Sequence, residues 1–197
     1  TGASSGIGAA AAIALSQAGA KVILSGRRAE KLRTIAADLD HETLVAPLDV
    51  SIAEDVTQVV DQIMAQYGRI DILVHSAGLN ITDRAWPKLS TSNWNKVIDV
   101  DLNGAFYCCH SVLSIMQKQQ DGLIINISSW AGRYVSRVSG GAYSAAKHAL
   151  NAMTESINQE YCADGIRACA ICPGEVATEI LDARPVPVSA EDRSRMV

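Results

Sequence analysis

The sequence lacks several features that would assign it to a class directly. No basic run is longer than the Gly-Arg-Arg of 26–28, and the net charge of the 197 residues is −4, so nucleic-acid binding has little electrostatic support. No apolar run approaches the roughly 18–20 residues of a membrane-spanning helix, and no secretory signal is visible. We therefore expect a cytoplasmic protein that binds neither nucleic acid nor membrane.

The five cysteines are few and scattered. Cys108 and Cys109 are adjacent, whereas Cys162, Cys169 and Cys172 are spread over an expected helix and strand. We expect all five to be reduced, mostly packed thiols and to hold no metal, the alternatives being disulfides or a metal site.

Strand and helix patterns alternate along the chain. Short apolar runs predict strands at 21–25, 43–48, 70–75, 123–128 and 167–172. Apolar stripes predict helices at about 30–39, 51–68, 92–117 and 143–163. In the second of these, Ser51 and Glu54 form a capping box and Gly68 closes the helix. The Pro-rich, then charged tail from 183 on is expected to lie outside the sheet.

Strands separated by helices predict a three-layer α/β/α fold with a parallel sheet. Ligands of such folds bind at the carboxyl ends of the strands. Functional residues are therefore expected directly after each strand.

The chain opens on a glycine-rich turn, Thr-Gly-Ala-Ser-Ser-Gly-Ile-Gly, which leads into an alanine-rich helix that Gly19 ends. Gly2, Gly6 and Gly8 would let a pyrophosphate approach the backbone N–H groups at a helix N-terminus. The alternative is a glycine-rich turn with no ligand. Such a turn normally follows a buried strand, which is expected to precede Thr1 and to be missing from this chain.

Two further patterns carry chemistry. Tyr143 and Lys147 are four residues apart on one helix face, where the ammonium group favours the phenolate and makes Tyr143 a usable acid/base. Alone, the pair equally fits a solvated helix face. Ser129 follows a predicted strand and is a candidate to hold a substrate oxygen, or simply a cap at the end of that strand.

Taken together, these motifs resemble the short-chain dehydrogenase/reductase family. The resemblance covers about residues 1–180 and rests on the glycine turn, Leu-Asp-Val-Ser, Ser-Ala-Gly, Asn-Ile-Ser-Ser, Tyr-Ser-Ala-Ala-Lys and Cys-Pro-Gly-Glu-Val-Ala-Thr, in this order. It implies a doubly wound Rossmann fold that binds a nicotinamide dinucleotide. Residues 1–197 are then one dinucleotide-binding and catalytic domain, truncated at both ends, without its first and C-terminal strands.

The resemblance also implies residue roles. Tyr143 matches the catalytic acid/base, Ser129 the residue that orients the reacting oxygen, and Lys147 the partner of the tyrosine and of the nicotinamide ribose. The residues implied to bind the cofactor are Gly2, Ser4, Ser5, Gly6, Ile7, Gly8, Arg27, Arg28, Asp49, Val50, Ser76, Ala77, Gly78, Tyr143, Lys147, Pro173, Gly174, Val176 and Thr178. The implied reaction is reversible hydride transfer between the nicotinamide and a carbonyl or secondary alcohol.

Two positions depart from the family pattern. His75 and Ser76 stand where the family usually has Asn-Asn, and we expect His75 to be a packed histidine at a strand end rather than a base. Asp101 stands where a catalytic Asn is common. That Asn acts largely through its backbone carbonyl, a role that Asp can fill, so Asp101 is kept as a catalytic candidate.

The residues after the second predicted strand favour NADP(H), although NAD(H) binding stays open. Gly26 replaces the acidic residue that would bind a ribose 2′-hydroxyl, and Arg27 and Arg28 could pair with a 2′-phosphate. The alternative is two solvated arginines.

The substrate itself is left open: 3-oxoacyl, 3-hydroxy acid and sugar or polyol types all fit. Candidate apolar walls are Trp86, Trp130 and Tyr134. Arg84, Arg133 and Arg137 could meet an anionic group, or be surface charges or subunit contacts. The resemblance implies a homodimer or homotetramer. A non-catalytic NADP(H)-binding regulator of the same fold is the alternative function.

Overall fold

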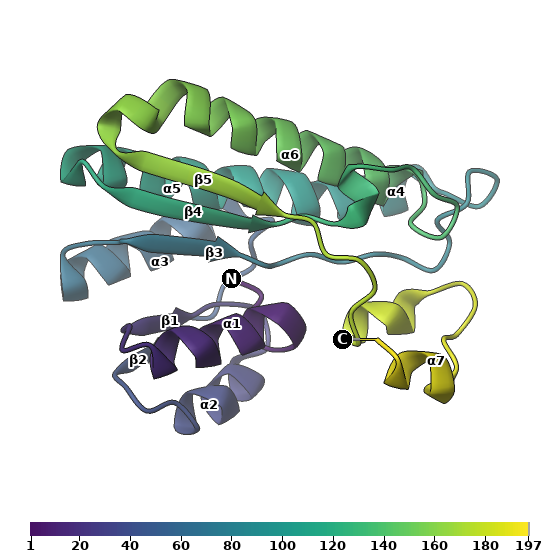
Figure 1. Cartoon of the computed structure of the whole chain (residues 1–197), viewed down its shortest axis with the longest axis horizontal. Coiled ribbons are helices and arrows are strands. Elements are labelled where there is room, and N and C mark those ends of the chain that lie inside the picture. The colour runs from purple at the N-terminus through teal and green to yellow at the C-terminus, as the bar shows by residue number, and fades with distance from the viewer. Residues whose placement is uncertain (197) are drawn as a thin grey trace.

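The structure, a computed structural model, describes residues 1–196 and alternates strands with helices (Figure 1). The smaller sheet pairs β1 (Val22–Leu24) with β2 (Thr43–Val45). The larger sheet has the order β3 (Ile72–His75), β4 (Gly122–Ile127), β5 (Ile166–Ile171). Each of these pairings is parallel. The α/β class predicted from the alternation and the Rossmann-like fold implied by the resemblance are confirmed.

The strands form two separate parallel sheets, because no strand within residues 1–196 pairs with both β1 and β3. An apolar groove of about 430 Å³ lies between these strands, lined by residues of β1, β3, α1 (Gly6–Gln17) and α3 (Ala53–Tyr67). The two sheets therefore carry separate hydrophobic cores.

Helices pack on each sheet through their apolar stripes. Met116 of α5 (Gly104–Gln119) is fully buried with Ile124 of β4 and Ile166 of β5, in the core that α6 (Gly141–Tyr161) also covers. In the smaller unit, Leu24 of β1 and Leu32 of α2 (Ala29–Ala37) are fully buried with residues of α1. In Figure 1, α6 lies along β4 and β5.

Two expected helix ends have different outcomes. Gly68 ends α3 in the left-handed conformation with φ 71°, as predicted. Ser51 does not cap α3, because the helix begins later, at Ala53 after an Ile52 N-cap without a side-chain bond. The Ser51 hydroxyl instead donates to Asp49 Oδ1 at 2.7 Å, so the predicted capping box is wrong.

The helix predicted over 92–117 contains a π-helical turn. It divides into α4 (Thr91–Ile98), the π-turn η1 (Asp99–Asn103) and α5. A π-turn adds a residue to the helix and is frequent at functional sites. Here it carries the fully buried Asp101.

Four short elements lie after β4, after α6, after β5 and in the tail. These are η2 (Trp130–Gly132), η3 (Cys162–Asp164), η4 (Glu179–Ala183) and α7 (Ala190–Ser194). The tail lies outside the sheets, as predicted (Figure 1). No helix among residues 1–196 has the length and apolar character to span a membrane.

The cysteines are less packed than expected. Cys108 and Cys109 are buried, whereas Cys162 and Cys169 are exposed, and all five thiols are free. Cys169 is exposed because it lies on the face of β5 that no element within residues 1–196 covers. Burial raises the pKa of Cys108 to about 11 and that of Cys109 to about 12, so both stay protonated thiols.

Cys169 and Cys172 have the two-residue separation of a metal-ligand pair, which the sequence interpretation passed over. Cys172 lies just beyond the end of β5, and its Sγ contacts Asn151 Oδ1 at 3.8 Å. Within the described part of the chain, no group of three His, Cys, Asp or Glu residues is arranged to hold a metal.

Candidate active site

A cleft of about 940 Å³ lies at the carboxyl ends of the strands. It is lined by nearly all the residues that the sequence predicts for the site: Gly2, Ser4, Ser5, Gly6, Ile7, Arg27, Arg28, Asp49, Val50, Ser76, Ala77, Gly78, Ser129, Tyr143, Lys147, Pro173, Gly174, Val176 and Thr178. Gly8 and Asp101 are predicted site residues that do not line it; each supports a residue that does.

The glycine turn packs so closely that side chains are excluded. Gly2 has φ +64°, and a Cβ there would lie 2.7 Å from the Ala77 nitrogen. A Cβ on Gly8 would lie 2.4 Å from the Gly2 carbonyl oxygen. Gly8 therefore acts by letting α1 pack against the turn, and not by lining the cleft.

Helix α1 begins at Gly6 and directs its N-terminus at this cleft. Its N-cap, Ser5, makes no side-chain bond to the helix, and the first turn holds no acidic residue. The first N–H groups of a helix have no intrahelical partners and carry partial positive charge. This end of the cleft suits an anion such as a pyrophosphate.

At the other side of the turn, Arg28 lies against two serines. Its Nε and Nη2 donate to Ser4 Oγ at 3.0 and 2.8 Å, and Nη2 also donates to Ser5 Oγ at 2.7 Å. Arg27 is exposed beside it. The two arginines thus lie at the cleft's edge, where the sequence places a 2′-phosphate.

Asp49 is held by its own loop. The Ser51 N–H and hydroxyl both donate to Asp49 Oδ1, at 3.0 and 2.7 Å. Burial alone would raise the pKa of Asp49, but these bonds and the nearby Arg27 lower it. The carboxylate is ionised and fixed at the cleft wall.

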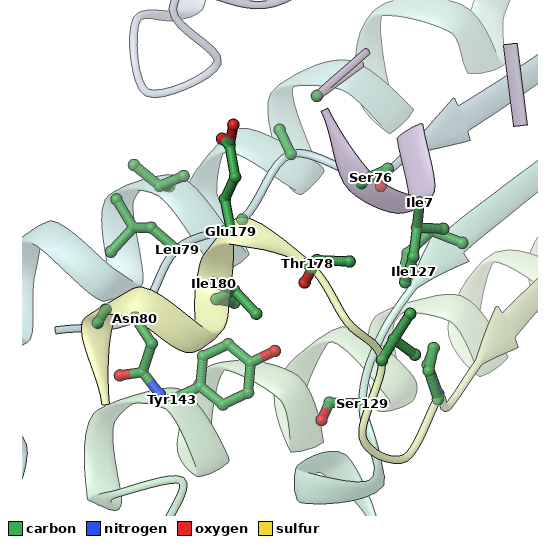
Figure 2. Close-up of a pocket in the computed structure, with 18 of the residues that line it drawn as sticks. Ile7, Ser76, Leu79, Asn80, Ile127, Ser129, Tyr143, Thr178, Glu179 and Ile180 are labelled. Atoms are coloured by element: carbon green, nitrogen blue, oxygen red, sulfur yellow. The ribbon is translucent and has the colours of Figure 1, made fainter. Parts of the chain in front are cut away.

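Tyr143 and Ser129 present hydroxyls to the same region of the cleft (Figure 2). Tyr143 lies in the first turn of α6, and Ser129 follows β4, where its Oγ accepts from the Ala131 N–H at 3.1 Å. The adjacent Ser128 is buried, and its hydroxyl donates to the Lys147 carbonyl. Both serines of the motif line the cleft, and the Ser128 hydroxyl also ties the end of β4 to α6.

Lys147 is a buried cation beneath Tyr143. Only 3% of it is exposed, and its Nζ lies 5.5 Å from the centre of the Tyr143 ring. Nζ donates to the Ile127 carbonyl at 3.0 Å. The Lys147 side chain is thus shielded from solvent and lies close to the Tyr143 ring.

Asp101 meets Lys147 through its side chain rather than only through its backbone. Its Oδ1 lies 3.5 Å from Lys147 Nζ and accepts from the Leu79 N–H at 3.0 Å. Its Oδ2 is buried without a hydrogen-bond partner. Burial raises the pKa of Asp101 to about 6, although Lys147 and the Leu79 N–H act against that shift.

His75 is fully buried at the end of β3, as predicted. Its Nδ1 lies 3.2 Å from Thr1 Oγ1. Burial lowers the pKa of His75 well below its ordinary value, so the ring is neutral. It packs at the strand end and does not line the cleft.

The segment after β5 forms one wall of the cleft. The Trp130 N–H donates to the Pro173 carbonyl at 2.8 Å, which ties this segment to the end of β4. Thr178, Glu179 and Ile180 follow along the cleft, and in Figure 2 the Glu179 side chain points away from Tyr143. Glu179 was missed by the sequence interpretation, because one acidic residue in a loop carries no signal by itself.

Arg84 is a buried strut in the cleft wall and not the surface charge that was one of its expected roles. It is 5% exposed, and its guanidinium donates to the carbonyls of Ile81, Val138 and Ala183. These carbonyls belong to three separate loops around the cleft. Its Nε, Nη1 and Nη2 thus each donate to a backbone carbonyl at the cleft wall.

Of the other residues expected to contact the substrate, some line the cleft and some do not. Trp130 lines the cleft, but Trp86 and Tyr134 do not. Arg133 and Arg137 also lie off the cleft and are exposed. Asn80, which lies in the segment 79–88 that the sequence places beside the substrate, lines the cleft and donates to the Ser139 carbonyl at 2.9 Å.

These features fit a nicotinamide dinucleotide along the cleft. The closely packed glycine turn and the open N-terminus of α1 suit the pyrophosphate. Arg27 and Arg28 line the cleft beside the turn, and Tyr143 and Lys147 line it beyond β4.

Comparisons with known proteins agree with this geometry. The sequence profile described as short chain dehydrogenase matches residues 1–186. An uncharacterized oxidoreductase of Staphylococcus aureus (strain USA300) is 36% identical over 181 residues, which cover 91% of this chain and 78% of that protein. One from Staphylococcus saprophyticus is 39% identical over 184 residues, with the same coverages.

Solved structures give the same result. Levodione reductase superposes with a TM-score of 0.88 at 32% identity, covering 91% of this chain and 71% of that one. An alcohol dehydrogenase from Thermococcus sibiricus, solved with 5-hydroxy-NADP, gives a TM-score of 0.86 at 28% identity, covering 95% and 79%.

Proposed function

Since this chain belongs to the short-chain dehydrogenase family and is an oxidoreductase of that type, we propose that it transfers a hydride reversibly between NADP(H) and the carbonyl or secondary alcohol of a small molecule. The observation that carries the proposal is the placement of Ser129 and Tyr143 at one cleft wall above the buried Lys147. Candidate substrates are 3-oxoacyl compounds, 3-hydroxy acids and sugars or polyols.

In the proposed mechanism, the nicotinamide supplies the hydride in reduction and accepts it in oxidation. The Tyr143 hydroxyl donates its proton to the substrate oxygen as the carbonyl carbon is reduced. The Ser129 hydroxyl donates a hydrogen bond that orients this oxygen. Lys147 stabilises the phenolate left on Tyr143 and would hold the nicotinamide ribose, and Asp101 holds Lys147 in place.

The other residues of the cleft would bind the rest of the cofactor. The glycine turn and α1 would hold the pyrophosphate, and Asp49, Val50, Ser76, Ala77 and Gly78 the adenosine. Pro173, Gly174, Val176 and Thr178 would hold the carboxamide. NADP(H) is preferred in this proposal because Arg27 and Arg28 lie at the cleft's edge and Gly26 replaces an acid.

We also propose that the protein acts in the cytoplasm as a homodimer or homotetramer. Five free thiols suit a reducing compartment. Phe106 of α5 is 49% exposed, which suits a helix that meets another subunit.

The test is turnover of the full-length protein with NADPH against a panel of ketones, 3-oxo thioesters and sugars, with Tyr143→Phe alongside. The variant removes one hydroxyl, so we expect kcat to fall by about 10²–10⁴-fold, the range for a positioned acid, while NADPH fluorescence still reports binding. Tight NADPH binding without turnover of any compound would contradict the proposal and favour a nucleotide-binding regulator.

A further inference from the structure

Glu179 bridges the cleft at its Arg28 end. Its Oε2 accepts from Arg28 Nη1 at 2.6 Å, and its Oε1 accepts from Lys31 Nζ at 2.7 Å. Arg28 and Lys31 belong to the start of α2, whereas Glu179 begins η4, about 150 residues further along the chain. One carboxylate therefore joins the two sides of the cleft.

This bridge uses the group that the sequence assigns to the cofactor. The remaining Arg28 contacts are to the hydroxyls of Ser4 and Ser5. The guanidinium thus already has one anion and two hydroxyls around it. Hydrogen bonds from Lys31 and Arg28 lower the pKa of Glu179 to about 2, so the carboxylate is ionised at neutral pH.

We propose that Glu179, in the cofactor-free protein, takes the anion position on Arg28 that the 2′-phosphate of NADP(H) would occupy, and is thereby a specificity-determining residue. This inference rests on the proposed binding of NADP(H). A 2′-phosphate must displace the carboxylate to reach Arg28, whereas NAD(H) carries no group that competes with it. Glu179 therefore weakens NADP(H) binding and leaves NAD(H) binding nearly unchanged.

The expected size follows from the exposure of the bridge. The side chains of Arg28, Lys31 and Glu179 are 42%, 52% and 47% exposed, so solvent and salt screen the pairs. If the Glu179 bridge occupies Arg28 in most molecules, NADPH can bind only to the fraction of molecules in which the bridge is open. Its apparent Kd is then the intrinsic Kd divided by that fraction. We expect Glu179→Gln to tighten NADPH binding by about three- to tenfold at low ionic strength.

The experiment measures Kd for NADPH and NADH by nucleotide fluorescence in the full-length protein, at low and at moderate salt. Glu175→Gln is the matched control, because Glu175 lies on the same segment but accepts from Arg184. Arg28→Ala and the double variant Arg28→Ala/Glu179→Gln complete a double-mutant cycle, which measures the coupling between Arg28 and Glu179.

The inference is supported if Glu179→Gln tightens NADPH binding alone, if Glu175→Gln does not, and if the gain shrinks without Arg28. It is overturned if Glu179→Gln leaves NADPH binding unchanged or weakens it. The proposed NADP(H) preference fails separately, if Arg28→Ala weakens NADPH and NADH equally.

Discussion

The Asp101 carboxylate shows how one side chain can tune a buried site. It neutralises the Lys147 ammonium at 3.5 Å, yet leaves its own Oδ2 without a partner. A buried carboxylate with an unsatisfied oxygen binds a proton more readily than one in water. Its charge, and so the net charge beneath Tyr143, changes close to neutral pH.

This raised pKa predicts a pH-dependent stability. The native pKa of Asp101 is about 6, against an ordinary 3.8. The folded protein then binds the proton more tightly than the unfolded chain, so this contribution is present below pH 4 and is lost as pH rises through 6. We expect Asp101→Asn, which cannot titrate, to gain stability relative to the native protein between pH 4 and 7, seen as a growing difference in Tm.

Asp99→Asn is the control, because Asp99 lies on the same π-turn but is exposed. Asp101→Asn also removes the counter-charge of Lys147, which can shift the Tm of the variant by the same amount at every pH. The readout is therefore the change of the Tm difference with pH, and not its absolute size. A Tm difference that stays flat from pH 4 to 7 would show that Asp101 does not titrate in this window.

At the residue scale, the sequence predicts which residues form the site better than it predicts how their side chains pair. The motif order located Tyr143, Ser129 and Lys147, and the structure brings all three together. The side-chain pairing of Asp101 with Lys147 was not predicted, because it depends on a π-turn that adds one residue to a helix with ordinary periodicity. Glu179 has no local pattern at all.

Among the elements, the loops around the cleft depend on Arg84. Its three contacts are charge-assisted bonds to buried or half-buried carbonyls of Ile81, Val138 and Ala183. Because such bonds are worth about 1.5–3 kcal/mol each and are not additive, we expect Arg84→Met to cost about 2–4 kcal/mol. Thermal unfolding measures the loss, and hydrogen exchange should accelerate in 133–140 and 176–184.

Arg137→Met is the matched control for that variant, because Arg137 is an exposed arginine within the segment 133–140. Unchanged exchange in both segments of Arg84→Met would mean that the loops are held by their own contacts. A drop in Tm without faster loop exchange would place the role of Arg84 in the core.

Element types were predicted more reliably than element ends. The apolar stripes identified α2, α3 and α6 to within about two residues, and Gly68 ended α3. Ser51 failed as a cap because α3 begins two residues later, at Ala53 after an Ile52 N-cap. The short helices η4 and α7 lack a long apolar stripe, so periodicity could not find them.

For the whole molecule, cofactor binding should appear as stability. A ligand that binds only the folded state adds about 2.7 kcal/mol at 100 times its Kd, which corresponds to roughly 5–10 °C in Tm for a chain of this size. If NADP(H) is preferred, NADPH should raise Tm more than NADH at the same concentration. Arg28→Ala should remove that difference, and equal shifts in the native protein would contradict the preference.

The division of the sheet shows where prediction at this scale ends. The parallel α/β order followed from alternating patterns, but the gap between β1 and β3 depends on which strands pair in space. The exposure of Cys169 has the same origin, because the sequence of β5 does not say which of its faces is covered.

Arg84 holds three segments at the rim of the cleft, those that contain Ile81, Val138 and Ala183. The way it holds them affects which residues of the rim can be substituted. Its partners are backbone carbonyls, and every amino acid carries one. The side chains of those loops can therefore be exchanged without removing the strut that fixes their course. Substrate choice and loop position are then separate properties, so the rim offers a place to alter specificity while the catalytic groups stay fixed.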